Sequence, residues 1–171
     1  MDIRQRILAL NIAGRIDSEV EPPQLRMNFM TDGADQQTVW SYVTEPELLA
    51  AWSPKVPDRP LTSVGPAEAR ENPEDAPFSV EVLAVDPGKQ VTHRWGDDLI
   101  TWTITGDRID FAIVLRELNA AAMYAAGWQV CFGVLAALLQ GEQQPRIVGE
   151  DAFRVGWQEL KERYDVEFAR P

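Results

Sequence analysis

The chain has 171 residues, of which 45% are hydrophobic and 25% are charged, as in a soluble globular protein with one sizeable core. Its 27 acidic and 16 basic residues give a formal net charge of -11. Nucleic acids and anionic membrane surfaces are bound by clustered basic residues, so the composition argues against both partners. The single cysteine, Cys131, excludes an intramolecular disulfide and fits a reducing compartment.

Residues 1–23 are predicted to form a helical extension that precedes the core. Asp2 is a suitable N-cap for a helix with apolar residues at helical spacing, and Gly14 is expected to end it. The segment has neither the uninterrupted apolar stretch nor the small-residue cleavage site of a signal peptide. We therefore expect a cytoplasmic protein.

The predicted core begins with a half-buried strand over residues 24–31, where apolar and polar side chains alternate. Short helices are predicted near residues 34–43 and 44–52. Residues 53–77 are rich in proline, which favours loops, with one short edge strand near residues 67–71.

Four further strands are predicted over residues 78–85, 90–95, 99–105 and 109–118. Short connectors rich in glycine and aspartate separate them, which is typical of antiparallel hairpins. Because these strands are segregated from the helices in the sequence, the fold class is α+β.

A long helix is predicted over Asn119–Gln140, and it is apolar on most sides. We expect it to pack inside a soluble domain and not to insert into a membrane. At 100° per residue, Gly127 and Cys131 fall on the face that we expect to meet the sheet, opposite Gln129. Glycine inside a helix costs about 1 kcal/mol relative to alanine. Gly127 therefore indicates either room for a ligand or close backbone packing.

Residues 150–168 are predicted to form a C-terminal amphipathic helix. Its apolar stripe is Phe153, Trp157, Leu160 and Tyr164, which recur at helical spacing on an otherwise charged segment. We expect this stripe to dock on the domain itself.

Several segments together resemble a known family. They are Val39–Pro54 (VWSYVTEPELLAAWSP), Phe78–Asp98 (FSVEVLAVDPGKQVTHRWGDD), Ala125–Glu142 (AAGWQVCFGVLAALLQGE) and Trp157–Tyr164 (WQELKERY). Their order and spacing resemble the START-like (SRPBCC) superfamily, in the branch named after activators of the heat-shock-protein-ninety ATPase. The resemblance covers most of the chain.

The resemblance implies a helix-grip fold, in which a curved antiparallel sheet wraps around the long C-terminal helix and leaves a pocket between them. Residues 1–171 would then form a single domain, with the helix-grip core at residues 24–141. Family members often carry a histidine where this chain has Gln129. If that histidine matters in relatives, this chain lacks its chemistry.

Nine residues are candidates for the lining of the implied pocket. They are Trp52, Val82, His93, Trp95, Trp102, Tyr124, Gly127, Trp128 and Cys131. Tryptophan rings around a cavity would suit a flat, apolar ligand. His93 shares a strand face with Trp95, so it is either a polar anchor for the ligand or an ordinary strand residue.

The sequence contains no glycine-rich phosphate loop, nucleophilic serine elbow or zinc motif. With one histidine and one cysteine, we expect no metal site and no cofactor. A nucleophilic pair of Cys131 and His93 is an alternative that requires the two side chains to meet.

Three functional hypotheses follow. The first is binding of a small apolar or aromatic molecule in a cavity between the sheet and the long helix. The second is a stress-related or chaperone-associated interaction, as the family name implies. The third is a cyclase- or hydrolase-type enzyme on the same fold, which would need convergent polar groups such as His93 and Tyr124.

Overall fold

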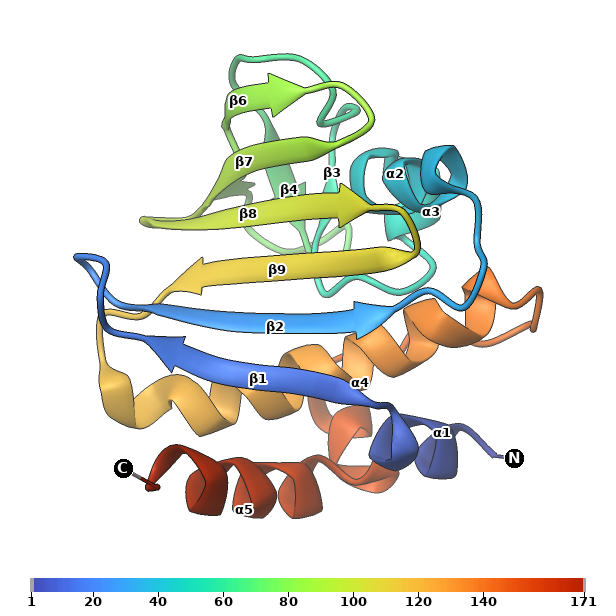
Figure 1. Cartoon of the computed structure of the whole chain (residues 1–171). Helices are drawn as coiled ribbons and strands as arrows, with labels where there is room; N and C mark the ends of the chain where they lie inside the picture. The colour runs from blue at the N-terminus through green and yellow to red at the C-terminus, as the bar shows by residue number, and fades with distance from the viewer. Residues whose placement is uncertain (1, 171) are drawn as a thin grey trace.

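The computed structural model describes residues 2–170. A twisted six-stranded sheet forms the frame of the molecule, and all of its neighbouring strands are antiparallel (Figure 1). Its strands are, in spatial order, β1 (Ile12–Asp17), β2 (Gln24–Met30), β9 (Arg108–Val114), β8 (Asp98–Thr105), β7 (Gln90–Trp95) and β6 (Val82–Asp86). In β2 the alternation works as predicted, because Leu25, Met27 and Phe29 are all buried.

Strand β1 corrects the prediction of a helical extension over residues 1–23. Helix α1 (Ile3–Ala9) is present, and the Asp2 carboxylate caps it by accepting a hydrogen bond from the Gln5 amide. The helix ends well before Gly14, however, and residues 12–17 pair with β2. A Cβ atom at Gly14 would lie 3.1 Å from the Tyr164 ring. The glycine therefore permits close packing inside a strand and does not terminate a helix.

A small second sheet lies beside the first. It consists of β3 (Val56–Pro57), β4 (Glu68–Arg70) and β5 (Phe78–Ser79). The strand predicted over residues 78–85 is thus divided between the two sheets. Its first part pairs with β4, and the Val80 amide donates to the Ala67 carbonyl before the chain turns into β6. Helices α2 (Gln36–Thr44) and α3 (Pro46–Leu49) follow β2, close to their predicted positions.

The long helix α4 (Ala121–Leu139) follows the 3-10 turn η1 (Leu118–Ala120) and packs across one face of the six-stranded sheet. Helices α1 and α5 (Trp157–Phe168) pack on the other side of α4 (Figure 1). By length and composition α4 could cross a membrane, but most of it is buried inside the domain. This arrangement fits a soluble domain, and it confirms the prediction of an α+β fold with a sheet around a long helix.

The C-terminal helix is shorter than predicted. Residues 149–155 form the 3-10 helix η2 (Gly149–Val155), and α5 begins only at Trp157. Gly156 separates the two because its φ of 101° is left-handed, and a Cβ atom there would collide with the Leu8 side chain. Phe153 therefore leaves the predicted stripe and is exposed, whereas Leu160 and Tyr164 are buried.

The face of α4 that meets the sheet also differs from the predicted one. Trp128 and Phe132 contact Phe111 of β9, with ring centroids 4.7 and 5.3 Å apart. Gly127 is half-buried and faces Trp157 of α5. The helix is apolar on nearly all sides, so the angular pattern had no polar face with which to orient it.

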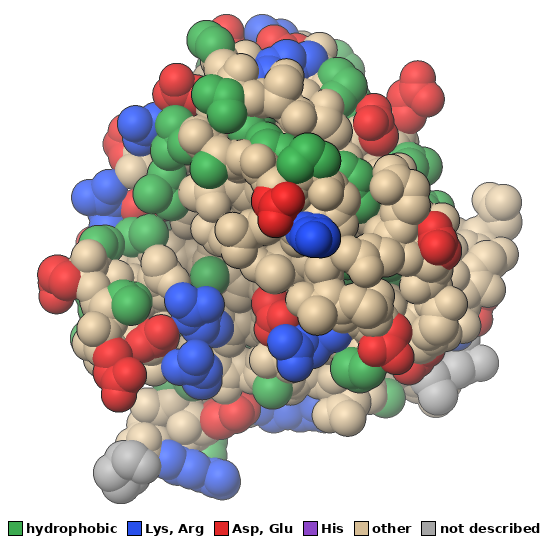
Figure 2. Space-filling model, turned by 45° about the horizontal axis from the view of Figure 1, so that its top comes forward, with side chains coloured by type: hydrophobic (Ala, Val, Ile, Leu, Met, Phe, Trp, Pro, Cys, Tyr) green, Lys and Arg blue, Asp and Glu red, His purple; other side chains and the backbone are tan. Residues whose placement is uncertain are grey.

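Charged side chains are dispersed over the surface. On the face seen in Figure 2, Lys and Arg alternate with Asp and Glu, and no large basic area is visible there. Most of the ion pairs are on the surface, as in Arg154 with Asp151 and Lys161 with Asp165. Exposed pairs of this kind contribute little to stability.

Candidate functional site

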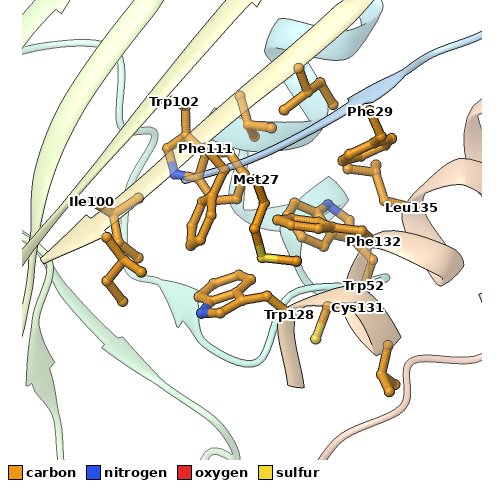
Figure 3. Close-up of a cluster of buried hydrophobic side chains, with 14 of the residues drawn as sticks. Met27, Phe29, Trp52, Ile100, Trp102, Phe111, Trp128, Cys131, Phe132 and Leu135 are labelled. Atoms are coloured by element: carbon orange, nitrogen blue, oxygen red, sulfur yellow. The ribbon is translucent and has the colours of Figure 1, made fainter. Parts of the chain in front are cut away.

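The space between the sheet and α4 is filled mainly by aromatic side chains (Figure 3). The rings of Trp52, Trp102, Phe111, Trp128 and Phe132 form a connected cluster with centroid separations of 4.7–6.2 Å. The hollow that is left measures ≈ 20 Å³, which is room for about one water molecule. The pocket predicted between sheet and helix is therefore closed in this structure.

A larger cleft lies on the flank of α4, between this helix and residues 147–157. Its volume is ≈ 280 Å³. Tryptophan rings from three elements border it: Trp95 at the end of β7, Trp128 in α4 and Trp157 at the start of α5. The rest of the lining is mostly apolar, and Glu71 is the one charged residue in it.

Five of the nine predicted residues line this cleft, namely Trp95, Tyr124, Gly127, Trp128 and Cys131. His93 and Trp102 instead border the ≈ 20 Å³ hollow. Trp95 and Trp128 border both this hollow and the cleft. Trp52 is buried in the aromatic cluster, and Val82 is fully buried at the edge of the six-stranded sheet.

The imidazole of His93 is bonded to protein groups at both nitrogens. Nδ1 donates to the Arg94 carbonyl at 2.8 Å, and Nε2 accepts from the Trp102 indole at 3.0 Å. Only a neutral ring can do both. Burial lowers the pKa of His93 to about 4, against a smaller opposing effect of the Arg94 hydrogen bond. His93 is therefore a neutral core residue, and it is neither a free base nor a ligand anchor.

Cys131 borders the cleft but has no activated thiol. Burial raises its pKa to about 12, and nearby Glu71 adds to this effect while Arg146 opposes it. The thiolate is the nucleophilic form, so this thiol is unreactive at neutral pH. Because Cys131 and His93 border different hollows, the structure does not form the nucleophilic pair considered from the sequence.

Arg146 anchors one wall of the cleft. Its guanidinium donates to the carbonyls of Ser53 at 2.7 Å, Pro54 at 2.8 Å and Glu71 at 2.8 Å. Pro54 and Glu71 line the cleft, as do residues 147–149 that follow the arginine. A single side chain thus joins the segment after α4 to two loops on the opposite rim.

Sequence reasoning missed Arg146 and the cleft walls that it holds. The connector that contains it, Gly141–Glu150, shows no pattern beyond polarity and one proline. The three carbonyls that it contacts belong to loops 75 to 93 residues away along the chain. Trp157 was expected only as a packed residue of the last helix, yet it borders the cleft.

Gln129 has a structural role. Its amide Nε2 donates to the Ile7 carbonyl at 2.9 Å, and its Oε1 accepts a hydrogen bond from the Tyr164 hydroxyl. The side chain is buried between α1 and α5, and it does not border the cleft. Gln129 therefore holds α1 and α5 against α4.

No protein-family model and no curated protein sequence matches the chain. Solved structures do resemble it. CalU16 from Micromonospora echinospora has a TM-score of 0.68 at 15% identity, over 92% of this chain and 95% of that chain. A conserved protein of unknown function, EF2215 from Enterococcus faecalis, has a TM-score of 0.65 at 14% identity, over 96% and 94%.

An AHSA1-like protein from Aeromonas hydrophila has a TM-score of 0.52 at 14% identity, over 69% of this chain and 94% of that chain. At identities this low, such similarity speaks for the fold alone. Together with the antiparallel sheet that packs around α4, these similarities show that the chain has the START-like helix-grip fold.

Proposed function

We propose that the protein binds a small apolar or aromatic molecule in the cleft between α4 and residues 147–157. The observation that carries this proposal is the lining, which combines three tryptophan rings with apolar side chains and one charged residue. Ligand sites are concave and mostly apolar with few polar groups, and about 300 Å³ is the lower end of their usual volume. The sequence resemblance implied a pocket between the sheet and the long helix; that space is closed, and the proposal places the ligand instead in the cleft on the flank of the same helix.

Gly127 contributes the shape of the cleft. It lies in the wall formed by α4, and a Cβ atom there would have only the Trp157 indole nitrogen, at 3.9 Å, within contact distance. A larger residue would therefore project into the cleft without displacing the core. Of the two interpretations of this glycine, room for a ligand agrees better with these contacts than close backbone packing does.

A thermal-shift experiment tests the proposal with two naphthalene probes, 2-acetylnaphthalene and 2-isopropylnaphthalene. A molecule that binds only the folded chain stabilises it by RT ln(1 + L/Kd), where L is its free concentration, so Tm rises with the logarithm of that concentration once this exceeds Kd. We expect a dose-dependent rise for the natural chain and its loss in Gly127→Leu, which fills the cleft.

The matched control is Ala136→Leu, which places the same side chain on α4 beside a separate hollow of ≈ 270 Å³. This variant should keep the ligand-induced rise in Tm. The proposal is wrong if neither probe raises the Tm of the natural chain, or if Gly127→Leu responds as strongly as Ala136→Leu.

A further inference from the structure

We propose that the cleft selects neutral aromatic molecules that carry a hydrogen-bond acceptor, such as aromatic ketones, over hydrocarbons of the same shape. This inference rests on the proposed function and names the ligand class for the same site. It comes from the indole N–H groups of the tryptophans that border the cleft.

The core tryptophans have partners for their N–H groups. Trp52 donates to the Tyr42 carbonyl at 2.9 Å, and Trp102 donates to His93 at 3.0 Å. These bonds follow the general rule that a buried indole N–H finds an acceptor. They provide an internal reference within the same cluster of rings.

The three cleft tryptophans, Trp95, Trp128 and Trp157, differ from this reference. Within residues 2–170 their indole nitrogens form no hydrogen bond. They are nevertheless not fully buried, because the fully buried side-chain atoms without a hydrogen-bond partner are Gln24 Oε1 and Thr31 Oγ1. Solvent therefore reaches each of these N–H groups. A ligand that displaces this solvent must either accept the hydrogen bonds or leave the donors unpaired.

Trp128 is the most buried of the three cleft tryptophans. Its side chain is only 6% exposed, and the hollows that it borders are the cleft and the ≈ 20 Å³ space beside it. Figure 3 shows its nitrogen on the side of the ring turned away from Phe111 and Met27. The cleft is the only one of these two spaces with room for a ligand.

Trp157 places a second donor at the notch in α4. Its indole nitrogen lies 3.9 Å from the position that a Cβ atom of Gly127 would occupy. The absence of a side chain at Gly127 thus leaves space next to this indole nitrogen. A ligand carbonyl in the notch would accept the hydrogen bond, whereas a methyl group there would leave the donor unpaired.

The charges around the cleft favour a neutral acceptor over a carboxylate. Glu71 is the charged residue in the lining, and its charge acts on the Cys131 thiol of the same cleft. The Arg146 guanidinium is close enough to act on this thiol too, but its donors are directed to backbone carbonyls. An anionic ligand would therefore meet a like charge with no free cationic donor in the cleft lining.

The test compares the two probes by titration of the intact chain. 2-Acetylnaphthalene carries a carbonyl oxygen where 2-isopropylnaphthalene, which has nearly the same shape, carries a methyl group. A buried donor left unpaired is costly, so the ketone should bind roughly tenfold more tightly. In ¹⁵N–¹H spectra of the indole groups, the ketone should shift Trp128 and Trp157 downfield. The resonances of Trp52 and Trp102 should barely move.

Trp157→Phe keeps an aromatic ring but removes one donor, so it should weaken ketone binding, remove a cost of hydrocarbon binding, and thereby narrow the preference for the ketone. The Trp52 and Trp102 resonances show whether this variant is folded. The titration of the natural chain tests acceptor selection even if the variant does not fold.

Equal affinity for both probes would overturn acceptor selection and leave ligand binding intact. Binding of neither probe would overturn the proposed function itself. Tighter binding of trimethylphenylammonium than of the ketone would show that the rings hold a cation instead.

Discussion

Gly127 and Gly133 of the long helix α4 differ in what surrounds them. Gly127 faces the cleft, where an added methyl group has space. At Gly133, a Cβ atom would overlap the Ile7 side chain and lie 3.0 Å from the Ile7 backbone Cα. The sequence pointed to Gly127 as the unusual residue, but it is Gly133 that the packing of α1 on α4 requires.

Alanine substitutions at these two positions should have opposite effects on stability. Gly127→Ala should stabilise the chain by up to about 1 kcal/mol through helix propensity. Gly133→Ala should destabilise it by about 1–3 kcal/mol, because the backbone of α1 must move. Urea unfolding measures both free energies. Equal stability of the two variants would contradict the packing described here.

The pH dependence of stability should carry a contribution from His93, the only histidine in the chain. Its pKa is about 4 in the folded protein, against an ordinary value of 6.5. Between these values the unfolded chain binds the extra proton, so stability is complete above pH 6.5 and falls as the pH is lowered towards 4. The loss amounts to about 3 kcal/mol at most.

The variant His93→Gln isolates this contribution, since its amide still offers an acceptor to Trp102. Urea unfolding at several pH values should show the natural chain losing stability more steeply than the variant from pH 6.5 to 4. Carboxylates that titrate in the same range affect both proteins alike. Parallel curves would mean that His93 takes up its proton in the folded chain as readily as in the unfolded chain.

At the scale of elements, the segment after α4 is a wall of the cleft and depends on one side chain. Arg146 joins it to three backbone carbonyls, an arrangement that needs the planar fork of a guanidinium. Because these bonds lie at the boundary of the cleft, their loss would change access to the site and leave the six-stranded sheet intact.

Replacement of Arg146 by methionine should therefore speed amide hydrogen exchange in residues 141–156 and leave exchange in β8 and β9 unchanged. Arg154→Met is the matched control, because Arg154 lies in the same segment and pairs only with Asp151 on the surface. Exchange that is equally fast in both variants would show that Arg146 does not hold the wall.

Helices and strands were predicted correctly where neighbouring residues in the sequence determine them. Alternating side chains located β2, and hairpin connectors located β7 and β8 to within a residue or so. Strand β1 was missed because Gly14 resembles a helix stop. A glycine is needed there because the position packs against the ring of Tyr164, which is 150 residues away along the chain. The orientation of α4 was missed because nearly every side of this helix is apolar.

The candidate site was only partly predictable for a related reason. Five of its lining residues were named because aromatic and small residues stood out in β7 and α4. The opposite wall is formed by residues 147–157, whose position depends on Arg146 and on the left-handed Gly156. No pattern within residues 147–157 predicts which surface of the domain this segment will cover.

For the whole molecule, the structure leads us to propose one cooperative unit that includes the first 23 residues. Ile7 of α1 fills the space at Gly133, and β1 extends the six-stranded sheet beside β2. Cytoplasmic location and a chaperone-associated role stay predictions from the sequence and its resemblance.

Deletion of residues 1–17 should therefore abolish cooperative folding, since it exposes the edge of β2 and removes the packing of α1 on α4. In the full chain, urea unfolding followed by tryptophan fluorescence and by circular dichroism should coincide. Truncation after Phe168, where α5 ends, is the control and should leave the transition unchanged. An unaltered midpoint after the N-terminal deletion would show a dispensable extension.

The pairing of Gln129 with both Ile7 and Tyr164 has a consequence for the order in which the chain is made. On the ribosome, the sheet and α4 are complete while α5 has not yet emerged. Until Tyr164 appears, the Gln129 carbonyl oxygen has no protein partner, and one side of α4 has no cover. Because domains fold as units during synthesis, this one should close only after α5 has emerged. Until then, the apolar side of α4 that α5 covers in the folded chain is exposed.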